Sequence, residues 1–366
     1  MKVSEVINKY NFGSDVVNVE QYGSGRINRT FIVECENGKK YILQAVNTNI
    51  FKDVDGLMGN IVKVSNFLSE KYQARNESDD FVLKVFPTAE GKTYTEIDGK
   101  VFRVLNFIEN SACFDDARTP EQMRELGRII GKFHSDFQNF DASQLATTIP
   151  NFHNTQKRYS KFMASVSNPA SLERASIARK DILALVERKA YANLIVSAIK
   201  EGSVPARVTH NDPKFNNIMF DATTGEARGL VDWDTIMPDS LLSDVGDAIR
   251  SACNTAGEEE RDLSKVGFNK EFYKAFMEGY IPEMAEAMTD KEKELLPYAP
   301  LCLTDELAIR FLDDYLNMDE YFGVINEDDN LNRSRVQFAL LKDMENNFEF
   351  MKETVETILE EQSQLQ

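Results

Sequence analysis

The chain has 366 residues, and its 60 Asp and Glu residues outnumber its 42 Lys and Arg residues, which gives a formal net charge of −18. At roughly 150 residues per domain, this length predicts about two domains or lobes. So acidic a chain is unsuited to hold nucleic acid or an anionic membrane over its whole surface, and we expect neither as a partner.

The composition is that of a folded cytoplasmic protein. Hydrophobic residues make up 42% of the chain, and its four cysteines include no C-x-x-C pair, so we expect reduced thiols. The N-terminus has no apolar segment typical of a signal peptide, and no apolar run approaches the ~20 residues of a membrane helix. We therefore expect a cytoplasmic location and no obligate protein partner.

The first third of the chain is rich in predicted strands. Asn37-Gly38 separates two β-prone runs, which is typical of a tight hairpin because both residues tolerate positive φ. Apolar residues at helical spacing follow over residues 57–72. Three further strand-like runs come next, at residues 81–87, 92–98 and 100–109. The sequence therefore predicts an antiparallel sheet over about residues 18–108, with one helix inserted after its third strand.

The remainder of the chain is predicted to be mostly helical. Thr119, followed by Pro120 and then Gln122, has the pattern of a helix start with Thr as the N-cap. Residues 171–200 repeat the helical spacing of apolar residues, and residues 340–358 predict one long amphipathic helix. The fold class is therefore predicted to be α+β, with the sheet in the N-terminal part and a larger, mainly helical C-terminal part.

The side chains that suggest catalysis are concentrated in one segment. His210, Asp212 and Asn217 give the pattern H-x-D-x-x-x-x-N, and two short predicted strands follow, joined by a turn and ending at Asp232. A hairpin of this length brings its two ends together, so we expect Asn217 next to Asp232, with Asp212 on the loop before them. His210 is expected to pin this loop by hydrogen bonds.

This arrangement suits phosphoryl transfer. A carboxylate such as Asp212 can accept the proton of a substrate hydroxyl, and an Asn with a second carboxylate can hold Mg²⁺, which prefers oxygen ligands. The metal neutralises charge that develops on phosphate oxygens. The alternative is that Asp212 and Asn217 cap turns and that Asp232 is a surface acid. Spacing, residue types and strand context agree better with a magnesium-dependent kinase.

With these motifs the sequence resembles the protein-kinase-like phosphotransferases, whose catalytic loop has the same H-x-D-x-x-x-x-N pattern and whose metal-binding Asp follows a hairpin. Val231-Asp232-Trp233 is similar to the I-D-W form of the aminoglycoside and choline kinase branch. The helix from Leu126 to His134 is similar to that branch's L-G-x-x-x-x-x-x-H helix. The resemblance is closer still to bacterial N-acetylhexosamine 1-kinases and spans nearly the whole chain, through YGSGRIN, YILQAVN, RVTHNDPKFNNI, DATTGEAR and RFLDDYL.

The resemblance implies a two-lobed protein-kinase-like fold with ATP and Mg²⁺ as cofactors. Residues 1–105 would form the N-terminal nucleotide-binding lobe, and residues 106–366 the C-terminal catalytic and substrate-binding lobe. It also implies transfer of the γ-phosphate to the anomeric hydroxyl of a small-molecule sugar, N-acetylglucosamine or N-acetylgalactosamine.

The resemblance also assigns roles to individual residues. It makes Asp212 the base, and Asn217 and Asp232 the Mg²⁺ ligands. It places the other matched residues in three groups: Gly23 and Gly25 in the turn that covers the phosphates, Leu105, Phe107 and Ile108 at the hinge that meets adenine, and Arg310 and Tyr321 facing the sugar. The Gly-x-Gly pattern alone would also fit a plain loop.

The chain departs from the protein-kinase pattern at one cationic contact. Protein kinases pair a Lys on the third strand with a Glu on the following helix, but the strand position here is Gln44, and the helix has no Glu before Glu70. Gln44 can make only neutral hydrogen bonds, so we expect it to contribute little to polyphosphate binding. Lys214 is the expected contact to the γ-phosphate. The alternative for Lys214 is a solvent-exposed loop lysine.

Alternatives for the function and for Arg310 stay open at this point. A kinase of another small alcohol, such as an aminoglycoside, choline or homoserine, would suit an acidic cleft. A catalytically dead kinase fold used for binding would explain the missing Lys–Glu pair, although the intact Asp212 and Asp232 argue against it. Arg310 could equally form a structural ion pair with Asp313 or Asp314.

Overall fold

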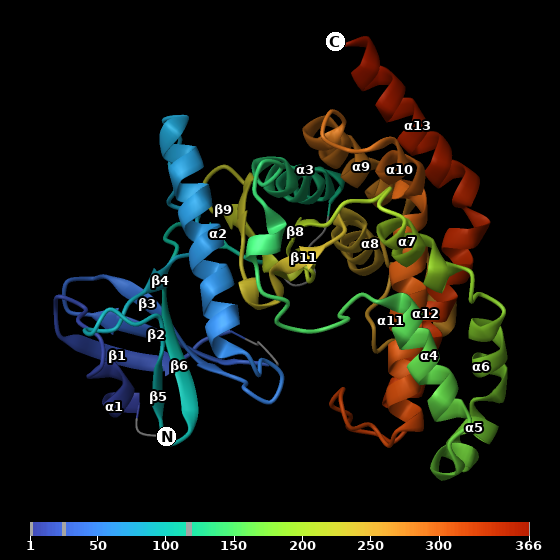
Figure 1. Cartoon of the computed structure of the whole chain (residues 1–366), viewed down its shortest axis with the longest axis horizontal. Coiled ribbons are helices and arrows are strands. Elements are labelled where there is room, and N and C mark those ends of the chain that lie inside the picture. The colour runs from blue at the N-terminus through green and yellow to red at the C-terminus, as the bar shows by residue number, and fades with distance from the viewer. Residues whose placement is uncertain (1–2, 24–26, 115–118, 366) are drawn as a thin grey trace. The chain divides into compact units, whose positions relative to one another are not determined.

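The computed structural model describes residues 3–23, 27–114 and 119–365, and the chain divides into two units that we describe one at a time (Figure 1). The first unit combines Met1–Ala112, Ala142–Pro150 and Met219–Pro238. The second combines Cys113–Asp141, Asn151–Ile218 and Asp239–Gln366. The predicted lobe boundary between residues 105 and 106 stays a prediction.

An antiparallel sheet forms the body of the first unit. Besides helix α1 (Val3–Ile7), this part contains strands β1 (Val16–Gln21), β2 (Arg29–Cys35), β3 (Lys40–Val46), β4 (Val85–Phe86), β5 (Thr95–Ile97) and β6 (Lys100–Asn106). The strand order is β1-β2-β3-β6-β4, and β5 pairs with β6. The predicted hairpin joins β2 to β3, and Gly38 in its turn has a φ of +82°. At the β5–β6 turn both Asp98 and Gly99 have positive φ, the backbone twist of a two-residue hairpin.

Helix α2 (Val54–Ala74) is inserted after the third strand, as predicted. Asp53 caps it by accepting the backbone N–H three residues later. On the buried face of α2, Asn60 donates its side-chain amide to the carbonyls of Ala146 and Ile236, at 2.8 Å each. Asn60 therefore holds the two later segments of the first unit onto α2.

The predicted hairpin of the catalytic segment is present. Strands β9 (Ile218–Asp221) and β10 (Ala227–Leu230) form a sheet with β7 (Ser111–Ala112), in the order β10-β9-β7. The Asp221 carboxylate accepts two backbone N–H groups of the turn, at 2.8 and 3.0 Å, which fixes its shape. Asp232 follows β10 after one intervening residue. The short strands β8 (Arg207–Thr209) and β11 (Met237–Asp239) precede and follow this segment.

The second unit is mainly helical. Its helices are α3 (Pro120–Asp136), α4 (Thr155–Val166), α5 (Leu172–Ile177), α6 (Arg179–Val186), α7 (Tyr191–Lys200), α8 (Leu241–Ala252), α9 (Lys270–Met284), α10 (Asp290–Leu295), α11 (Ala299–Leu316), α12 (Asp329–Asn346) and α13 (Phe348–Gln364). Helix α3 begins at the predicted cap, where Thr119 and Gln122 form a reciprocal capping box. The predicted α+β fold, with an N-terminal antiparallel sheet and a mainly helical remainder, is confirmed. Within the described ranges, no helix is both long enough and apolar enough to cross a membrane.

Two glycines allow α3 and α9 to lie against each other. A Cβ atom at Gly127 of α3 would overlap the carbonyl oxygen of Phe276 on α9. A Cβ atom at Gly279 of α9 would in turn overlap the carbonyl oxygen of Arg124 on α3. The glycine in the L-G motif of the sequence therefore serves the close approach of two backbones.

The prediction of one long C-terminal helix is wrong, because two helices, α12 and α13, occupy the region. Between them Asn347 leaves the helical conformation, with φ −106° and ψ 14°. Its side chain donates to the backbone carbonyl and to the carboxylate of Asp343, at 2.8 and 3.2 Å. Such bonds compete with continuation of the helix. The apolar spacing runs through the break, so it could not reveal it.

Candidate active site

A buried aspartate of α8 holds the predicted catalytic loop, residues 210–217, of the second unit. Asp244 accepts the N–H groups of His210 and Asn211, at 2.8 and 2.6 Å, and its Oδ2 lies 2.9 Å from Nε2 of His134 on α3. Asn211 has a φ of +64°, in the left-handed region that Asn enters more readily than most residues. The N–H of the next residue, Asp212, donates to Nδ1 of His210 at 3.3 Å. His210 thus takes part in the hydrogen bonding of the loop.

Asp212, Lys214 and Asn217 lie together on this loop. Nζ of Lys214 is 2.8 Å from Oδ1 of Asp212, and Nδ2 of Asn217 donates to the backbone carbonyl of Asp212, also at 2.8 Å. The charge of Asp212 raises the pKa of Lys214 above its usual range, so Lys214 is a cation at neutral pH. The Lys214 side chain is 43% exposed, so its ammonium stands at the surface of the unit beside the predicted base.

Asn217 and Asp232 offer oxygen atoms of the kind that Mg²⁺ binds. The amide nitrogen of Asn217 is used by Asp212, so Oδ1 is the atom that can coordinate a cation. Asp232 has a φ of +63°, a strained conformation that clusters at functional sites. The described residues contain no group of three His, Cys, Asp or Glu that could hold a metal, but a kinase-type Mg²⁺ needs only one Asp, one Asn and phosphate oxygens. The donor set therefore fits Mg²⁺; the convergence of Asn217 with Asp232, which belongs to the other unit, stays a prediction.

Asp232→Ala is expected to weaken binding of the Mg–nucleotide complex, because it removes a charged ligand. Mutation of a residue that only orients a metal ligand typically lowers metal affinity by about 10–100-fold. For the loss of a ligand itself we expect the affinity for the Mg–nucleotide complex to fall by at least about tenfold. Calorimetry with a nonhydrolysable ATP analogue, with and without Mg²⁺, measures it. Circular dichroism should show a retained fold, and Glu226→Ala on the same hairpin is the control. Unchanged Mg–nucleotide affinity would mean that Asp232 is not a ligand.

The predicted phosphate-covering turn lies between β1 and β2. Gly23 has a φ of +73°, a conformation that glycine adopts without strain, whereas Gly25 lies outside the described residues. Tyr22 meets the ring of Phe107 edge-on, with 6.3 Å between the ring centroids. The glycine turn therefore contacts the predicted hinge through these two rings, and the contacts of both with ATP stay predictions.

The other predicted hinge residues surround the end of β6. Leu105 and Ile108 are buried, and the carbonyl of Ile108 accepts the Ser111 hydroxyl at 2.8 Å. The side chain of Asn106 accepts the N–H of Lys84 at 2.7 Å. These bonds fix the chain where it leaves the sheet, and the predicted adenine contact there stays a prediction.

Gln44 lies on β3 as predicted, but its amide oxygen is bound by Arg103, to which the sequence pattern assigned no role. Nε and Nη2 of Arg103 donate to Oε1 of Gln44, at 2.9 and 2.7 Å, and Nη2 lies 2.5 Å from Oδ1 of Asp234. Arg103 is 1% exposed. The signal that could have found it is a single basic residue inside the apolar strand run VFRVL.

Arg310 lies on α11, and its ion-pair partner among the described residues is Glu306 rather than Asp313. Nη1 of Arg310 is 3.7 Å from Oε1 of Glu306. The guanidinium also lies over the rings of Phe152 and Phe322, at 5.4 and 5.6 Å from their centroids. The alternative of an ion pair with Asp313 or Asp314 is therefore wrong in its partner, because the carboxylate that pairs with Arg310 is that of Glu306, one helical turn before it on α11.

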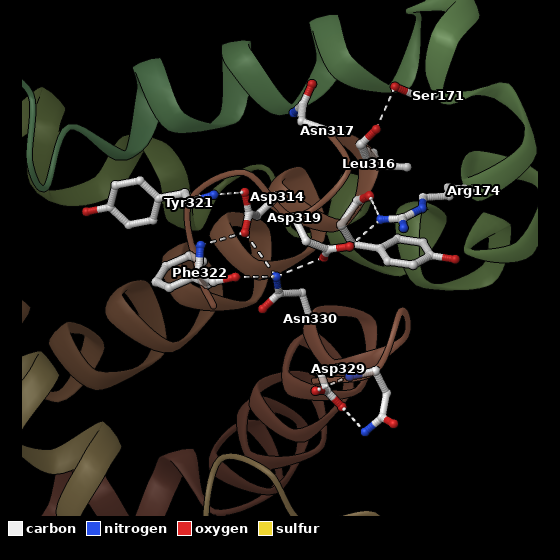
Figure 2. Close-up of polar contacts among 12 residues, drawn as sticks. Ser171, Arg174, Asp314, Leu316, Asn317, Asp319, Tyr321, Phe322, Asp329 and Asn330 are labelled. Atoms are coloured by element: carbon white, nitrogen blue, oxygen red, sulfur yellow. Dashed lines mark hydrogen bonds and ion pairs between the residues drawn. The ribbon is translucent and has the colours of Figure 1, made fainter. Parts of the chain in front are cut away.

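The loop that carries Tyr321 is held by Asp314, as Figure 2 shows. Asp314 accepts the N–H groups of Tyr321 and Phe322, at 2.9 and 2.8 Å, and the side-chain amide of Asn330 at 2.9 Å. Tyr321 is 58% exposed, and its ring points away from Asp314 (Figure 2). Phe322 therefore connects Arg310 to this loop, and the sugar contacts of Arg310 and Tyr321 stay predictions.

His153 connects α11 to the catalytic loop. Nδ1 of His153 is 3.2 Å from Oε1 of Glu306, and Nε2 is 3.2 Å from the backbone carbonyl of Asn211, which precedes Asp212. Burial lowers the pKa of His153, but the charge and hydrogen bond of Glu306 outweigh burial and raise the pKa to about 9. The protonated ring can donate to both partners at once. Sequence patterns did not indicate this link, because 153 positions separate the two side chains.

The His153–Glu306 pair predicts a pH dependence of stability. The folded pKa of about 9 exceeds the unfolded value, so the contribution of His153 to the free energy of unfolding is complete below about pH 6.5 and is lost as pH rises through the folded pKa. A pKa shift of this size corresponds to a contribution on the order of 3 kcal/mol to the free energy of unfolding. Urea unfolding of the wild-type protein should show a decrease in the free energy of unfolding as pH rises from about 6.5 to about 9. The His153→Gln variant should lack this decrease. Equal decreases in both proteins would contradict the assigned charge.

Comparison with known proteins shows the family to which the chain belongs. A model of the APH phosphotransferase enzyme family matches residues 18–287. The fold is similar to amicoumacin kinase hAmiN in complex with AMP-PNP, Ca²⁺ and Ami, with a TM-score of 0.60 and 14% identity, covering 94% of this chain and 92% of that one. It is equally similar to a microcompartment-associated aminopropanol kinase, with a TM-score of 0.60 and 13% identity over 96% and 98% of the two chains.

A more distant relative is the Plasmodium vivax ethanolamine kinase, with a TM-score of 0.54 and 13% identity over 88% of this chain and 80% of that one. At such identities the likeness concerns the fold alone, which is the kinase-like fold that the sequence motifs predicted. The family model, however, covers more than half of the chain, including the catalytic loop and the Asp232 segment. The chain therefore belongs to the phosphotransferase enzyme family.

Proposed function

We propose that this phosphotransferase is an ATP- and Mg²⁺-dependent kinase that acts on the anomeric hydroxyl of N-acetylglucosamine or N-acetylgalactosamine. The observation that carries the kinase assignment is the loop on which the Asp212 carboxylate lies 2.8 Å from the Lys214 ammonium. Asn217 is bonded to the same loop backbone. One structural relative is in complex with AMP-PNP, which supports an adenine nucleotide as the phosphoryl donor.

In the proposed mechanism the protein supplies a base and fixed charges. Asp212 accepts the proton of the anomeric hydroxyl as that oxygen bonds to the γ-phosphorus and the bond from phosphorus to ADP breaks. The Lys214 ammonium stabilises the negative charge on the oxygens of the transferring group. Mg²⁺ held by Asn217 and Asp232 would supply charge neutralisation along the polyphosphate.

The surroundings of Arg310 favour an uncharged acceptor. Burial and the charge of Arg310 lower the pKa of Arg158, so the two guanidinium groups lie close enough to repel each other. Burial opposes the charge of Glu306, but His153 and both arginines hold the pKa of Glu306 below its usual range. A cationic substrate would add a further positive charge here, whereas the hydroxyl and amide oxygens of an N-acetylhexosamine can accept hydrogen bonds from Arg310.

The second candidate is a kinase of an amino alcohol or an aminoglycoside. It is favoured by the net charge of −18 and by structural relatives that are an aminopropanol kinase and an ethanolamine kinase. A binding protein without activity is a weaker candidate, because Asp212 and Lys214 are both present and in contact.

A substrate screen with Mg-ATP separates these functions. The panel is N-acetylglucosamine, N-acetylgalactosamine, glucose, galactose, choline, homoserine and kanamycin, with release of ADP as the readout. We expect turnover with an N-acetylhexosamine and a product that is no longer a reducing sugar, because its anomeric oxygen is esterified. Preference for choline or kanamycin would support the second candidate. Nucleotide binding with no turnover on any acceptor would support the third.

Arg310→Met is expected to raise KM for the sugar while KM for ATP stays unchanged. Hydrogen bonds to a charged group contribute about 1.5–3 kcal/mol, which corresponds to about 10–100-fold in KM. Steady-state kinetics with each substrate varied in turn measures the effect. Lys161→Met, which removes an exposed cation of α4, is the matched control. A rise confined to KM for ATP would place Arg310 at the nucleotide instead of the sugar.

A further inference from the structure

The first unit contains a buried ion pair where the Lys–Glu pair of protein kinases, here called the Lys–Glu clamp, is missing. Arg103 on β6 lies directly opposite Gln44 of β3, the residue at the clamp-lysine position. In protein kinases the clamp glutamate lies on the helix that corresponds to α2. On α2 of this chain, the sulfur of Met58 lies 3.9 Å from Nη1 of Arg103. The carboxylate that balances Arg103 comes instead from Asp234, at 2.5 Å from Nη2.

This ion pair joins separate parts of the first unit. Gln44 accepts two hydrogen bonds from Arg103, at 2.9 and 2.7 Å. Asn28, which ends the glycine turn, donates to Oδ2 of Asp234 at 2.5 Å, and its own Oδ1 accepts a backbone N–H just after β3, at 2.9 Å. Asn28 and Arg103 of β6 therefore meet at the Asp234 carboxylate, and β3 is joined to them through the bonds of Gln44 to Arg103.

Stability alone does not account for the pair. The side chains of Arg103 and Asp234 are 2% and 3% exposed, so both groups lose their hydration, and replacing a buried ion pair by apolar side chains is often neutral or stabilising. What such a pair does provide is geometry, because the guanidinium is a planar fork with fixed donor directions. Asp232 lies two residues before Asp234 in the chain and has a φ of +63°, so holding Asp234 in place also restrains the backbone that carries Asp232.

We propose that the Arg103–Asp234 ion pair, supported by Gln44 and Asn28, positions Asp232 for the Mg–nucleotide complex and so takes the place of the Lys–Glu clamp. The proposal rests on the proposed function, since it requires Asp232 to be a metal ligand. Arg103 is a positioning residue that does not touch the polyphosphate. Its Nε and Nη2 are bonded to Gln44 and Asp234, and the residue is 1% exposed.

The test is the gain in affinity for AMP-PNP that Mg²⁺ produces, measured by calorimetry with and without the metal. In Arg103→Met/Asp234→Leu, apolar side chains replace both charges, so no unpaired buried charge remains and we expect the fold to be kept. The Mg²⁺-dependent gain should fall by about 10–100-fold, the effect of losing a residue that orients a metal ligand, while affinity without Mg²⁺ changes by less than about threefold.

A matched variant and a conservative variant complete the design. Arg207→Met/Glu292→Leu removes another largely buried ion pair, of 2.7 Å, in the second unit, and should leave the gain unchanged. Should the Arg103 double variant not fold, Arg103→Lys takes its place, because it keeps the charge but loses the fork; it should show the same selective loss.

Two results would overturn the proposal. One is a full wild-type gain in a folded Arg103 variant. The other is an equal loss of affinity with and without Mg²⁺, since Arg103 would then contact the nucleotide directly. Asp232→Ala, measured alongside, separates the causes: if it keeps the gain, the proposed metal role of Asp232 has failed and the inference with it. If it loses the gain while the Arg103 variant keeps it, only the positioning role has failed.

Discussion

Asp212→Asn is expected to reduce the turnover of phosphoryl transfer by about 10²–10⁴-fold, the usual effect of removing a general base. Asn keeps the size of the side chain but cannot accept the proton of the acceptor hydroxyl. The loop should keep its shape, because the bonds that fix it use the Asp212 backbone and the Asp244 carboxylate. Affinity for the nucleotide should therefore stay near the wild-type value while kcat falls.

The measurement is steady-state kinetics combined with calorimetric titration of an ATP analogue. Asp221→Asn makes the same chemical change on the neighbouring hairpin turn and should leave kcat unaltered, since that side chain only accepts backbone N–H groups of its turn. Near-wild-type turnover of Asp212→Asn would remove Asp212 from the role of base, whatever the acceptor proves to be.

Lys214→Ala is expected to reduce kcat by about 10²–10³-fold, the scale seen when a donor to developing transition-state charge is removed. The lysine lies 2.8 Å from Asp212, so in the proposed mechanism its charge would lie beside the reacting hydroxyl and the phosphoryl group that is transferred. The loss should fall on kcat more than on KM for the sugar, because the interaction is made mainly in the transition state.

Gln44→Ala is the informative comparison for Lys214→Ala. We expect it to reduce activity within roughly tenfold, as removal of neutral hydrogen bonds does, because Arg103 keeps its contact with Asp234. The two variants should be assayed side by side under saturating Mg-ATP. If Gln44→Ala is the more damaging, the polyphosphate contact belongs to the third strand, and the assignment of Lys214 to the γ-phosphate is wrong.

The elements that the sequence predicted well are those specified by local chemistry. The β2–β3 turn needed a residue that tolerates positive φ, and Gly38 supplied it. The start of α3 needed a reciprocal cap, and Thr119 and Gln122 supplied it. The proximity of Asp212, Lys214 and Asn217 could also be predicted, because they lie within six residues of one another; their catalytic roles stay predictions.

The parts that could not be predicted depend on contacts between distant positions. Arg103 and Asp234 are neighbours only in the fold, and a strand whose two faces are both buried gives no alternation that would mark one side chain as special. The His153–Glu306 pair likewise joins positions far apart in the chain, a turn before α4 and helix α11. At Asn347 the competing signal was local, but a single Asn is a weak helix-breaking signal within a continuous apolar pattern.

Asp244 has a consequence for the cooperativity of the protein. It accepts the amides of His210 and Asn211 and meets His134, whose other ring nitrogen lies 3.0 Å from the Tyr280 hydroxyl on α9. Opening this loop alone would leave a fully buried carboxylate without two of its hydrogen-bond donors, which is costly. We therefore expect the loop and helices α3, α8 and α9 to behave as one cooperative unit, and the two loop amides to exchange hydrogen with solvent only when that unit unfolds. The proposed base thus follows directly on a loop that is held by buried hydrogen bonds to the second unit, before any substrate arrives.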